Sequence, residues 1–342
     1  TSKVISNSTL GLRKFGVFLS GGIDSSLISY ELSQHIDDLN TFTNKVEPNV
    51  IINGEDHNSD ADIANKFASS LGFNHKEVKI TPEIIVKEWD KANFTIEEPR
   101  YNWNLPMYYF TNKFLNKNNI IVTMAGDIGD EIFGGYQKYI NMKKMINKPK
   151  TWRDFLKIWS KKFFAPIKLN IKFNQNDLVD VLEKTLPEEL WNPEDIANSA
   201  MALDCITTVS EDFFSRNDRY GMAFSMEGRF PLASKEYMQH CLSISSDYKI
   251  GDHETATKLP VRNTYKNKIP NYIFDKFKTG WSVPITNWLQ NSEIIKKKYL
   301  ETVNADDGIK EILDKDNYSG NAKRVIITWM IRTWSQQYNM IL

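Results

Sequence analysis

Several features that would place a chain in a special class are scarce or missing. The 342 residues include only two cysteines, Cys205 and Cys241, too few for a disulfide framework or a cysteine-rich metal site. No apolar run approaches the roughly 18 residues of a membrane span, and the chain does not open on a signal-peptide pattern. The five histidines lack a metal-site spacing such as HExxH. These absences favour a cytoplasmic protein with neither a membrane anchor nor a histidine metal centre.

Charge of one sign is also not in excess. Lys plus Arg (43) equals Asp plus Glu (43), so the chain as a whole offers no field for nucleic acid or a membrane. Hydrophobic residues make up 41% and charged residues 25%, which is typical of a globular protein with a large core. The basic and aromatic stretch 143–164 is interpreted as amphipathic helices with a solvated face, and an RNA or partner surface stays the alternative.

The first 140 residues alternate strand and helix patterns. "FGVFL" is an apolar run typical of a buried parallel strand, and a helix pattern containing Leu27 and Ile28 follows it. Further strands are expected at "NTFT", "HKEVKI" and "NIIVTMAG", and further helices at "DADIANKFASSLGF", "TPEIIVKEW" and 106–115. This alternation predicts an α/β fold, a parallel twisted sheet covered by helices. We expect an α/β nucleotide-binding core over 1–140 and a mainly helical portion over 141–342 that completes the active site.

The stretch "SGGIDSS" separates the first strand from its helix. Backbone N–H groups in such a turn and the positive end of the helix favour an anion, and three serines add hydroxyl donors. The stretch contains no lysine and matches neither GxxxxGK(S/T) nor GxGxxG. It therefore suits a pyrophosphate held by backbone dipoles, with Asp24 placed to help hold Mg²⁺. The alternative is a Ser/Gly turn that only caps a helix.

A second motif, "GDIGDEIFGGY", follows the buried strand "NIIVTMA". It brings Asp127, Asp130 and Glu131 to the carboxyl end of a parallel strand, where open α/β sheets bind ligands. Carboxylates beside a polyphosphate need a cation between them, and Mg²⁺ suits oxygen ligands and phosphates. Compensation of a helix dipole is the simpler alternative.

These motifs resemble those of two related groups. "SGGIDSS" resembles the loop of the ATP-pyrophosphatase (PP-loop) superfamily, and "GDIGDEIFGGY" resembles the signature of the asparagine synthetase family. Four further stretches resemble that family in its own order: "SDADIANKFASSLGFNHKEV", "EEPRYNWNLP", "NDRYGMAFSMEGRFP" and "KLPVRNTYKNKIPNYIFDKFKTGWSVP". The resemblance covers residues 15 to about 288, and the helical tail is also family-like.

The resemblance implies a PP-loop (adenine nucleotide α-hydrolase-like) synthetase domain over 1–342. Its activity would be an ATP-dependent ligase that adenylates a small carboxylate, with the aspartate side chain first, and transfers ammonia or another amine. By the same resemblance Lys278, Asp127 and Glu227 are catalytic, and Asp24 and Asp130 hold Mg²⁺. The residues that would bind ATP or pyrophosphate are Leu19, Ser20, Gly21, Gly22, Asp24, Ser25, Ser26, Thr43 and Gly126.

Departures from the family pattern keep alternatives open. Asp127 stands where many asparagine synthetases have Glu, Ile128 replaces a usual Gly, and Ser234 replaces a usual Asp. The amino-terminal glutaminase domain does not occur in the sequence, which begins at Thr1, so a glutaminase domain or subunit is an expected partner. A relative that closes rings with another amine and a catalytically idle nucleotide-binding subunit remain the alternatives.

Overall fold

A computed structural model describes residues 1–11, 14–52, 54–100, 102–161, 174–253, 256–275, 282–303 and 322–338, without the side chains of 322–325 and 328. The chain forms two compact units. The sheet unit consists of Gly11–Ala125, Arg216–Arg229 and Lys278–Leu342, and the helical unit of Thr1–Leu10, Gly126–Ser215 and Phe230–Phe277.

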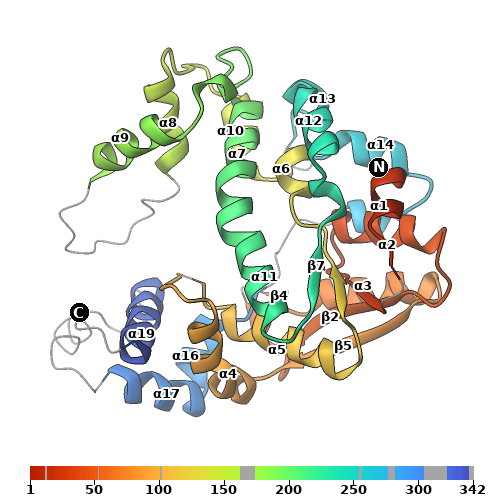
Figure 1. Ribbon diagram of the computed structural model, residues 1–342, viewed down its shortest axis with the longest axis vertical. Coiled ribbons are helices and arrows are strands. Elements are labelled where there is room, and N and C mark those ends of the chain that lie inside the picture. The colour runs from red at the N-terminus through yellow and green to blue at the C-terminus, as the bar shows by residue number, and fades with distance from the viewer. Residues whose placement is uncertain are drawn as a thin grey trace. The chain divides into compact units, whose positions relative to one another are not determined.

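The sheet unit contains a five-stranded parallel sheet with the order β5-β2-β1-β6-β7 (Figure 1). In register, Val17 of β1 lies between Thr41 of β2 and Met124 of β6. Parallel neighbours need crossover connections, and helices supply them between β1, β2, β5 and β6. The strands are β1 (Phe15–Phe18), β2 (Asn40–Val46), β5 (Asn74–Ile80), β6 (Val122–Met124) and β7 (Glu227–Arg229). The expected α/β class with a parallel sheet is confirmed.

The described helices between β1 and β6 match the expected ones in place and kind. Thr81 caps α4 by accepting a hydrogen bond from the backbone N–H of Ile84, and Gly72 adopts a φ of +70° just after α3. The sequence shows no pattern that predicts the short strands of this unit. These are β7, with three residues, and a hairpin of β3 (Ile51–Ile52) and β4 (Glu55–Asp56). The helices are α2 (Ile23–Ser33), α3 (Ser59–Ser70), α4 (Pro82–Thr95), α5 (Leu105–Lys117), α11 (Ser215–Met222), α16 (Ile285–Asn291), α17 (Glu293–Val303) and α19 (Ala322–Gln337).

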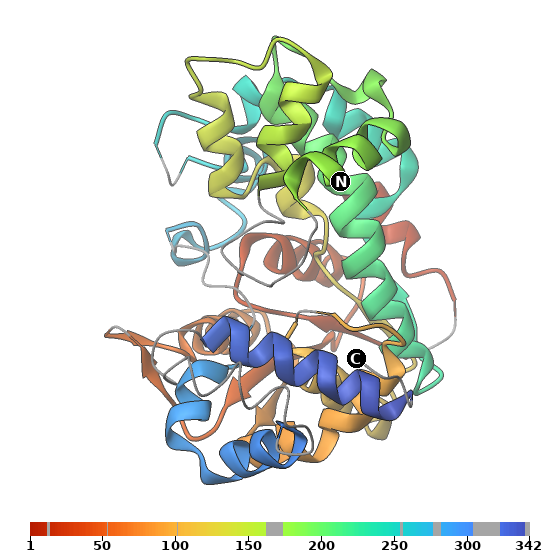
Figure 2. The ribbon, with the colours of Figure 1, turned by 90° about the vertical axis from the view of Figure 1, so that its left-hand side faces the viewer.

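One face of the sheet contributes to the main apolar core. Phe42 and Val78 belong to the same buried cluster as side chains of α4, α5, α16, α17 and α19. A Cβ added to Gly16 would lie 2.4 Å from the Phe42 ring, so glycine lets this ring pack directly on β1. Trp329 of α19 stacks on Trp89 of α4 with 3.7 Å between ring centroids. Helix α19 therefore packs on the core of the sheet unit (Figure 2).

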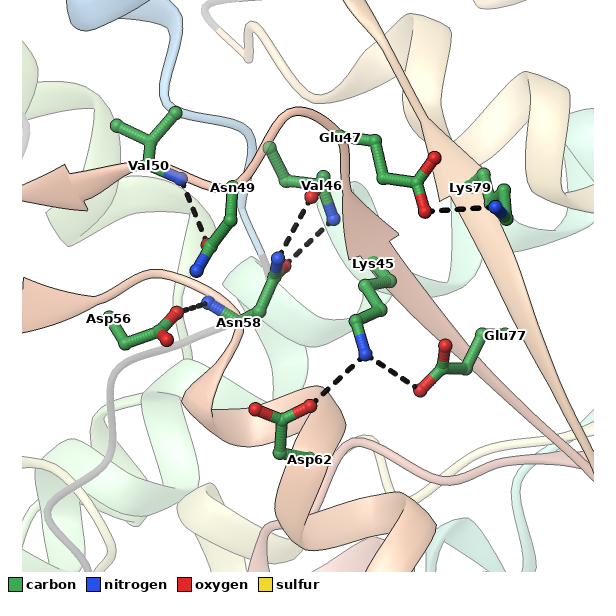
Figure 3. A network of polar contacts seen from close by, with 10 residues as sticks. All are labelled: Lys45, Val46, Glu47, Asn49, Val50, Asp56, Asn58, Asp62, Glu77 and Lys79. Atoms are coloured by element: carbon green, nitrogen blue, oxygen red, sulfur yellow. Dashed lines mark hydrogen bonds and ion pairs between the residues drawn. The ribbon is translucent and has the colours of Figure 1, made fainter.

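The part of the sheet that packs on α3 is polar. Thr41 and Thr43 of β2 are buried. Lys45, two residues further, bridges Asp62 of α3 and Glu77 of β5, with 3.1 Å from Nζ to each carboxylate (Figure 3). Burial alone lowers the pKa of Lys45, but the two carboxylates raise it above its ordinary value. Ion pairs therefore fix α3 over the ends of β2 and β5.

The connection from β2 to α3 is fastened by one amide side chain. Asn58 Oδ1 accepts a hydrogen bond from the Val46 N–H and Asn58 Nδ2 donates to the Val46 carbonyl, both at 2.8 Å (Figure 3). The Asn58 N–H donates to Asp56 Oδ1 at 2.8 Å. The side chain pairs with the strand end as a neighbouring strand would, so the residues just before α3 are held in place.

The helical unit has its own core, formed mainly by α7, α8 and α10. Asp204, fully buried at the end of α10, accepts hydrogen bonds from the Tyr139 hydroxyl (2.6 Å) and Trp159 Nε1 (3.1 Å) and pairs with Lys138. Burial and this carboxylate raise the pKa of Tyr139 well above its ordinary range. The elements are α1 (Ser2–Asn7), α6 (Gly129–Phe133), α7 (Gln137–Lys143), α8 (Trp152–Ser160), α9 (Gln175–Thr185), η2 (Glu188–Leu190), α10 (Ile196–Asp204), a π-helix η3 (Cys205–Phe214), η4 (Pro231–Ala233), α12 (Lys235–Ser243), α13 (Ser246–Lys249), α14 (Leu259–Tyr265) and α15 (Asn271–Phe274).

The basic and aromatic stretch forms α8 in this unit. Trp152, Phe155 and Trp159 are buried in the unit's core, while Arg153 pairs with Asp180 and Glu183 of α9. The amphipathic interpretation is confirmed for α8, and 162–164 lie outside the described residues. Both cysteines are free thiols and buried. Within the described ranges, no helix has the length and apolar character needed to cross a membrane.

Lys249 gives a test of the helical unit by pH. The side chain is fully buried, its Nζ donates to Asn198 Oδ1 at 2.7 Å, and burial lowers its pKa from 10.5 to about 8. Between these two values the unfolded chain binds more protons than the folded one, so stability rises with pH. Relative to Lys249→Met, the unchanged protein should gain at most roughly 3 kcal/mol across this window, measured by urea unfolding at stepped pH. Below pH 8 the free energy of unfolding of the unchanged protein should show its full deficit relative to Lys249→Met. A difference between the two proteins that does not change with pH would contradict the lowered pKa of Lys249.

Candidate functional site

The stretch Ser20–Ser26, called the loop here, follows the carboxyl end of β1, and its last four residues form the first turn of α2. The Leu19 N–H donates to the Phe42 carbonyl at 2.8 Å, so the pairing of β1 with β2 continues to the loop. Ser25 Oγ accepts from the Ser20 N–H and donates to the Gly22 carbonyl, both at 3.1 Å. Gly22 is the N-cap of α2 and brings no side chain to cap it. The N–H groups of the first helical turn therefore keep their capacity for an anion.

Gly21 is required by conformation and by space. Its φ is +75°, and an added Cβ would lie 2.5 Å from the Asp60 carbonyl oxygen in α3. Left-handed backbone costs a side-chain-bearing residue about 1–2 kcal/mol, and overpacking costs about 1–3 kcal/mol. Gly21→Ala should therefore lower the free energy of unfolding in urea by several kcal/mol and weaken ATP binding measured by calorimetry.

Gly22→Ala is the matched control one residue away. Gly22 has a φ of −85°, and an added Cβ would approach only Ser20 Oγ, at 3.4 Å. The control should keep most of the stability of the unchanged protein. Equal losses for the two variants would show that the loop does not depend on the conformation of Gly21.

Two hydroxyl groups, one in the loop and one beside it, are buried. Ser26 Oγ in the first turn of α2 and Thr43 Oγ1 in β2 find no hydrogen-bond partner among the described residues. A buried polar group left unsatisfied costs about 1–3 kcal/mol, which a bound ligand or water can recover. Both residues were expected at the nucleotide. Their unmet hydrogen-bonding capacity fits a polar ligand at this end of the sheet.

The second motif opens the helical unit with two left-handed residues. Ile128 has a φ of +73° at the N-cap of α6, and Gly134 has a φ of +74° at its C-cap. A β-branched residue in the left-handed region is strained by roughly 1–2 kcal/mol. Ile128 stands where the resemblance predicts glycine, and it adopts a left-handed conformation that glycine tolerates without strain. Asp127, just before this turn, is half-buried.

Asp130 in the first turn of α6 forms a buried ion pair. Lys258 Nζ lies 2.7 Å from Asp130 Oδ1, with side chains 6% and 8% exposed. A Cβ added to Gly135 would lie 1.9 Å from that oxygen and 2.5 Å from Lys258 Cε, so the second glycine of "GGY" makes room for the pair. Lys258 had no predicted role; its only signal in the sequence is the "KLPVR" stretch that begins with it.

Asp24 is the carboxylate at the loop that would be available to Mg²⁺. Asp24 lies in the first turn of α2, and its Oδ1 is inaccessible to solvent. No group of three or more His, Cys, Asp or Glu side chains suited to a metal ion occurs in the part of the chain that the structure describes. Mg²⁺ bound beside phosphates takes one or two carboxylates and keeps waters. Asp24 would be such a ligand in the sheet unit, and Asp130 is the corresponding candidate in the helical unit.

The predicted residues do not all lie in one part of the chain. Leu19, Thr43 and the loop lie together in the sheet unit, while Gly126, Asp127 and Asp130 begin the helical unit. Glu227 begins β7, is exposed, and accepts a hydrogen bond from Arg229 Nε at 2.8 Å. Lys278 lies outside the described residues. The catalytic roles of Asp127, Glu227 and Lys278 stay predictions.

Comparison with known proteins agrees with this arrangement of motifs. The family model described as asparagine synthase matches residues 5–318. Glutamine-hydrolyzing asparagine synthetase 1 of Bacillus subtilis is 24% identical, and the match covers 93% of this chain and 55% of that protein. Glutamine-hydrolyzing asparagine synthetase 3 of the same organism is 21% identical, with 88% and 52% covered. The chain thus spans about half the length of these relatives.

Among solved structures, a U34-tRNA thiolase of Methanococcus maripaludis is similar over 81% of this chain and 87% of that one. At 14% identity and a TM-score of 0.28, this likeness carries no argument. The family match is much stronger evidence, because it extends over most of the chain and includes both the loop and the acidic motif. The chain therefore belongs to the asparagine synthase family.

Proposed function

We propose that the chain is an AMP-forming ligase that activates a small carboxylate with ATP and converts it to an amide. The observation that carries the proposal is the Ser/Gly loop Ser20–Ser26, which has anion-binding geometry and no lysine. Such a loop holds pyrophosphate as a leaving group, whereas a phosphoryl-transfer loop carries a lysine for the terminal phosphates. Membership in the asparagine synthase family supports the same chemistry, with aspartate as the first carboxylate to test.

The reaction has two balanced steps. A carboxylate oxygen attacks the α-phosphorus of ATP, the bond to the β-phosphate bridging oxygen breaks, and pyrophosphate leaves. The amine nitrogen then attacks the acyl carbon, the bond from that carbon to AMP breaks, and the nitrogen loses a proton. Mg²⁺, when bound, supplies neutralisation of the phosphate charge.

The chain's own groups have separate tasks in these steps. The loop N–H groups and the hydroxyl of Ser26 bind the pyrophosphate. Lys278 stabilises the charge that grows on the α-phosphate. Asp127, half-buried at the start of the acidic motif, accepts the proton that the attacking amine loses.

The part of the relatives that this chain matches supports a proposal for the nitrogen source. The relatives are named glutamine-hydrolyzing, and the chain spans about half of their length. We propose that this chain by itself uses ammonia, and that a glutaminase domain or subunit supplies it when glutamine is the donor. Ammonium at raised pH should support amide formation by the chain, and glutamine should not.

Exchange of labelled pyrophosphate into ATP tests the function. With Mg²⁺ and aspartate the chain should catalyse exchange, and adding ammonium should yield AMP and the amide. Asp127→Asn should keep most of the exchange while losing amide formation, because its role begins after the adenylate forms. Release of ADP and phosphate would refute an AMP-forming ligase. Turnover only with a tethered amine would favour a ring-closing relative. Binding of ATP without pyrophosphate exchange would favour a catalytically idle nucleotide-binding subunit.

A further inference from the structure

The loop packs directly against the backbone of α3. A Cβ added to Gly21 would lie 2.5 Å from the Asp60 carbonyl oxygen and 3.3 Å from the backbone nitrogen of Ala64, so only a bare Cα fits against this turn. Just before the loop, the Leu19 N–H donates to the Phe42 carbonyl of β2 at 2.8 Å. The path of the loop is therefore set by two neighbours, β2 and the first turn of α3.

Asn58 ties this turn of α3 to β2. Its amide accepts from the Val46 N–H and donates to the Val46 carbonyl, both at 2.8 Å (Figure 3). Its own carbonyl accepts from the Asp62 N–H at 3.0 Å at the start of α3. Asp60, which contacts Gly21, lies two residues after Asn58 in the same turn. A continuous series of contacts thus leads from the end of β2, through Asn58 and α3, to the loop.

The Asn58 side chain serves this tie in place of its own helix. Asn58 is the N-cap of α3, yet its side chain makes no cap hydrogen bond. An Asn at this position ordinarily accepts from an N–H of the first turn and stabilises its helix. Here both polar groups of the amide bind the end of β2 instead. The side chain therefore determines where α3 begins on the sheet.

A second tie at this junction is weaker. Lys45 Nζ lies 3.1 Å from Asp62 Oδ1, with side chains 27% and 58% exposed. Water screens an ion pair this exposed, so it contributes little. Asn58 is 5% exposed, and its removal would take hydrogen-bond partners from the N–H and carbonyl of the buried Val46. Loss of Asn58 should therefore displace the turn more than loss of Lys45.

Anion binding makes the loop sensitive to the position of this turn. Backbone N–H groups bind an anion well only when they point at it together. A displacement of about 1 Å at a reacting group can cost about 100-fold in rate. We propose that Asn58 is a positioning residue of the pyrophosphate loop, which holds the first turn of α3 against Gly21 and so fixes the loop. This inference rests on the function proposed above.

Asn58→Ala tests the proposal with pyrophosphate and Mg²⁺ as the probe. The Kd for pyrophosphate in calorimetry should rise by about 10- to 100-fold, as it typically does when a residue that supports a binding group is lost. The rate of pyrophosphate exchange at low ATP should fall by a similar factor. Hydrogen exchange at the Leu19 and Ser20 amides should become faster. Asn58→Asp keeps an acceptor for the Val46 N–H but cannot donate to the Val46 carbonyl, so it should recover only part of the binding.

Asn93→Ala is the matched control in the same unit. Asn93 of α4 is 2% exposed and its Nδ2 donates to the Trp89 carbonyl at 2.8 Å, so this change also removes a buried amide contact. It should leave the Kd for pyrophosphate and the Leu19 and Ser20 amides unchanged, whatever its effect on stability. An equal rise of the Kd in the control would show that lost stability alone weakens the loop, and the proposal would be wrong.

The remaining outcomes separate the positioning role from the function itself. An unchanged Kd in Asn58→Ala, or slow exchange at its Leu19 and Ser20 amides, would overturn the proposal. If Asn58→Ala does not fold, Asn58→Asp decides by the same measurements. If the unchanged protein neither binds pyrophosphate nor catalyses exchange, the proposed function is refuted, and the two amides still show whether Asn58 holds the loop.

Discussion

Lys278→Ala should slow pyrophosphate exchange by about 100- to 1000-fold, which corresponds to about 2.7–4 kcal/mol of transition-state stabilisation. Negative charge grows on the α-phosphate during adenylate formation and again when the adenylate breaks down. A fixed cation beside that phosphate stabilises both transition states. ATP binding should change little, because in the proposed function the loop and Mg²⁺ would hold the nucleotide in the ground state. The Kd for ATP from calorimetry and kcat from exchange measure the two effects separately.

Two variants calibrate this result. Lys276→Ala removes a lysine from the same stretch, "DKFKTGW", and should leave exchange nearly unchanged. Lys278→Arg keeps the positive charge but replaces a compact ammonium by a planar guanidinium, so it should recover only part of the rate. If Lys278→Ala weakens ATP binding as much as it slows exchange, the lysine binds the ground state and its proposed role is wrong.

The sheet and its loop could be predicted because local patterns determine them. "FGVFL" is apolar along its whole length, since β1 is a central strand with neighbours on both sides. The loop needs glycine at Gly21 for its φ of +75° and for its approach to Asp60. Serines that bond across five residues of the same loop are equally local. Such features appear in the sequence as strings that can be recognised singly.

The rest of the site depends on contacts between distant residues, which no local sequence motif indicates. Strand β7 has three residues and owes its place to pairing with β6, so no periodic pattern announces it. Lys258 forms an ion pair with Asp130, which lies 128 positions away in the sequence. Asn104 accepts a hydrogen bond from the N–H of Val283, which lies 179 positions away. At Ile128 the local sequence is misleading, because a β-branched residue predicts that the chain will avoid the left-handed turn that it adopts. Tertiary contacts decide these cases, and the sequence shows only that polar residues are present.

Breaking the buried ion pair of Lys258 and Asp130 is expected to have a large effect on stability. Lys258→Met should lower the free energy of unfolding by about 3–5 kcal/mol, because it leaves a buried carboxylate without its cation. Urea unfolding measures the loss. Lys296→Met is the matched control, since Lys296 pairs with Glu293 at 2.8 Å with side chains 32% and 87% exposed. An exposed pair of this kind contributes at most about 1 kcal/mol. Similar losses in the two variants would show that burial does not determine the strength of the Asp130 pair.

Stability and chemistry separate when both charges are removed. Lys258→Met combined with Asp130→Asn leaves no unpaired charge, and a buried ion pair exchanged for neutral groups often costs little. The double variant should therefore recover most of the stability that Lys258→Met loses. It should nevertheless stay inactive in pyrophosphate exchange if Asp130 is a ligand of Mg²⁺, because an amide oxygen without charge is a weak substitute for a carboxylate. A stable double variant that regains exchange would show that Asp130 serves the fold through Lys258 and takes no part in holding the metal.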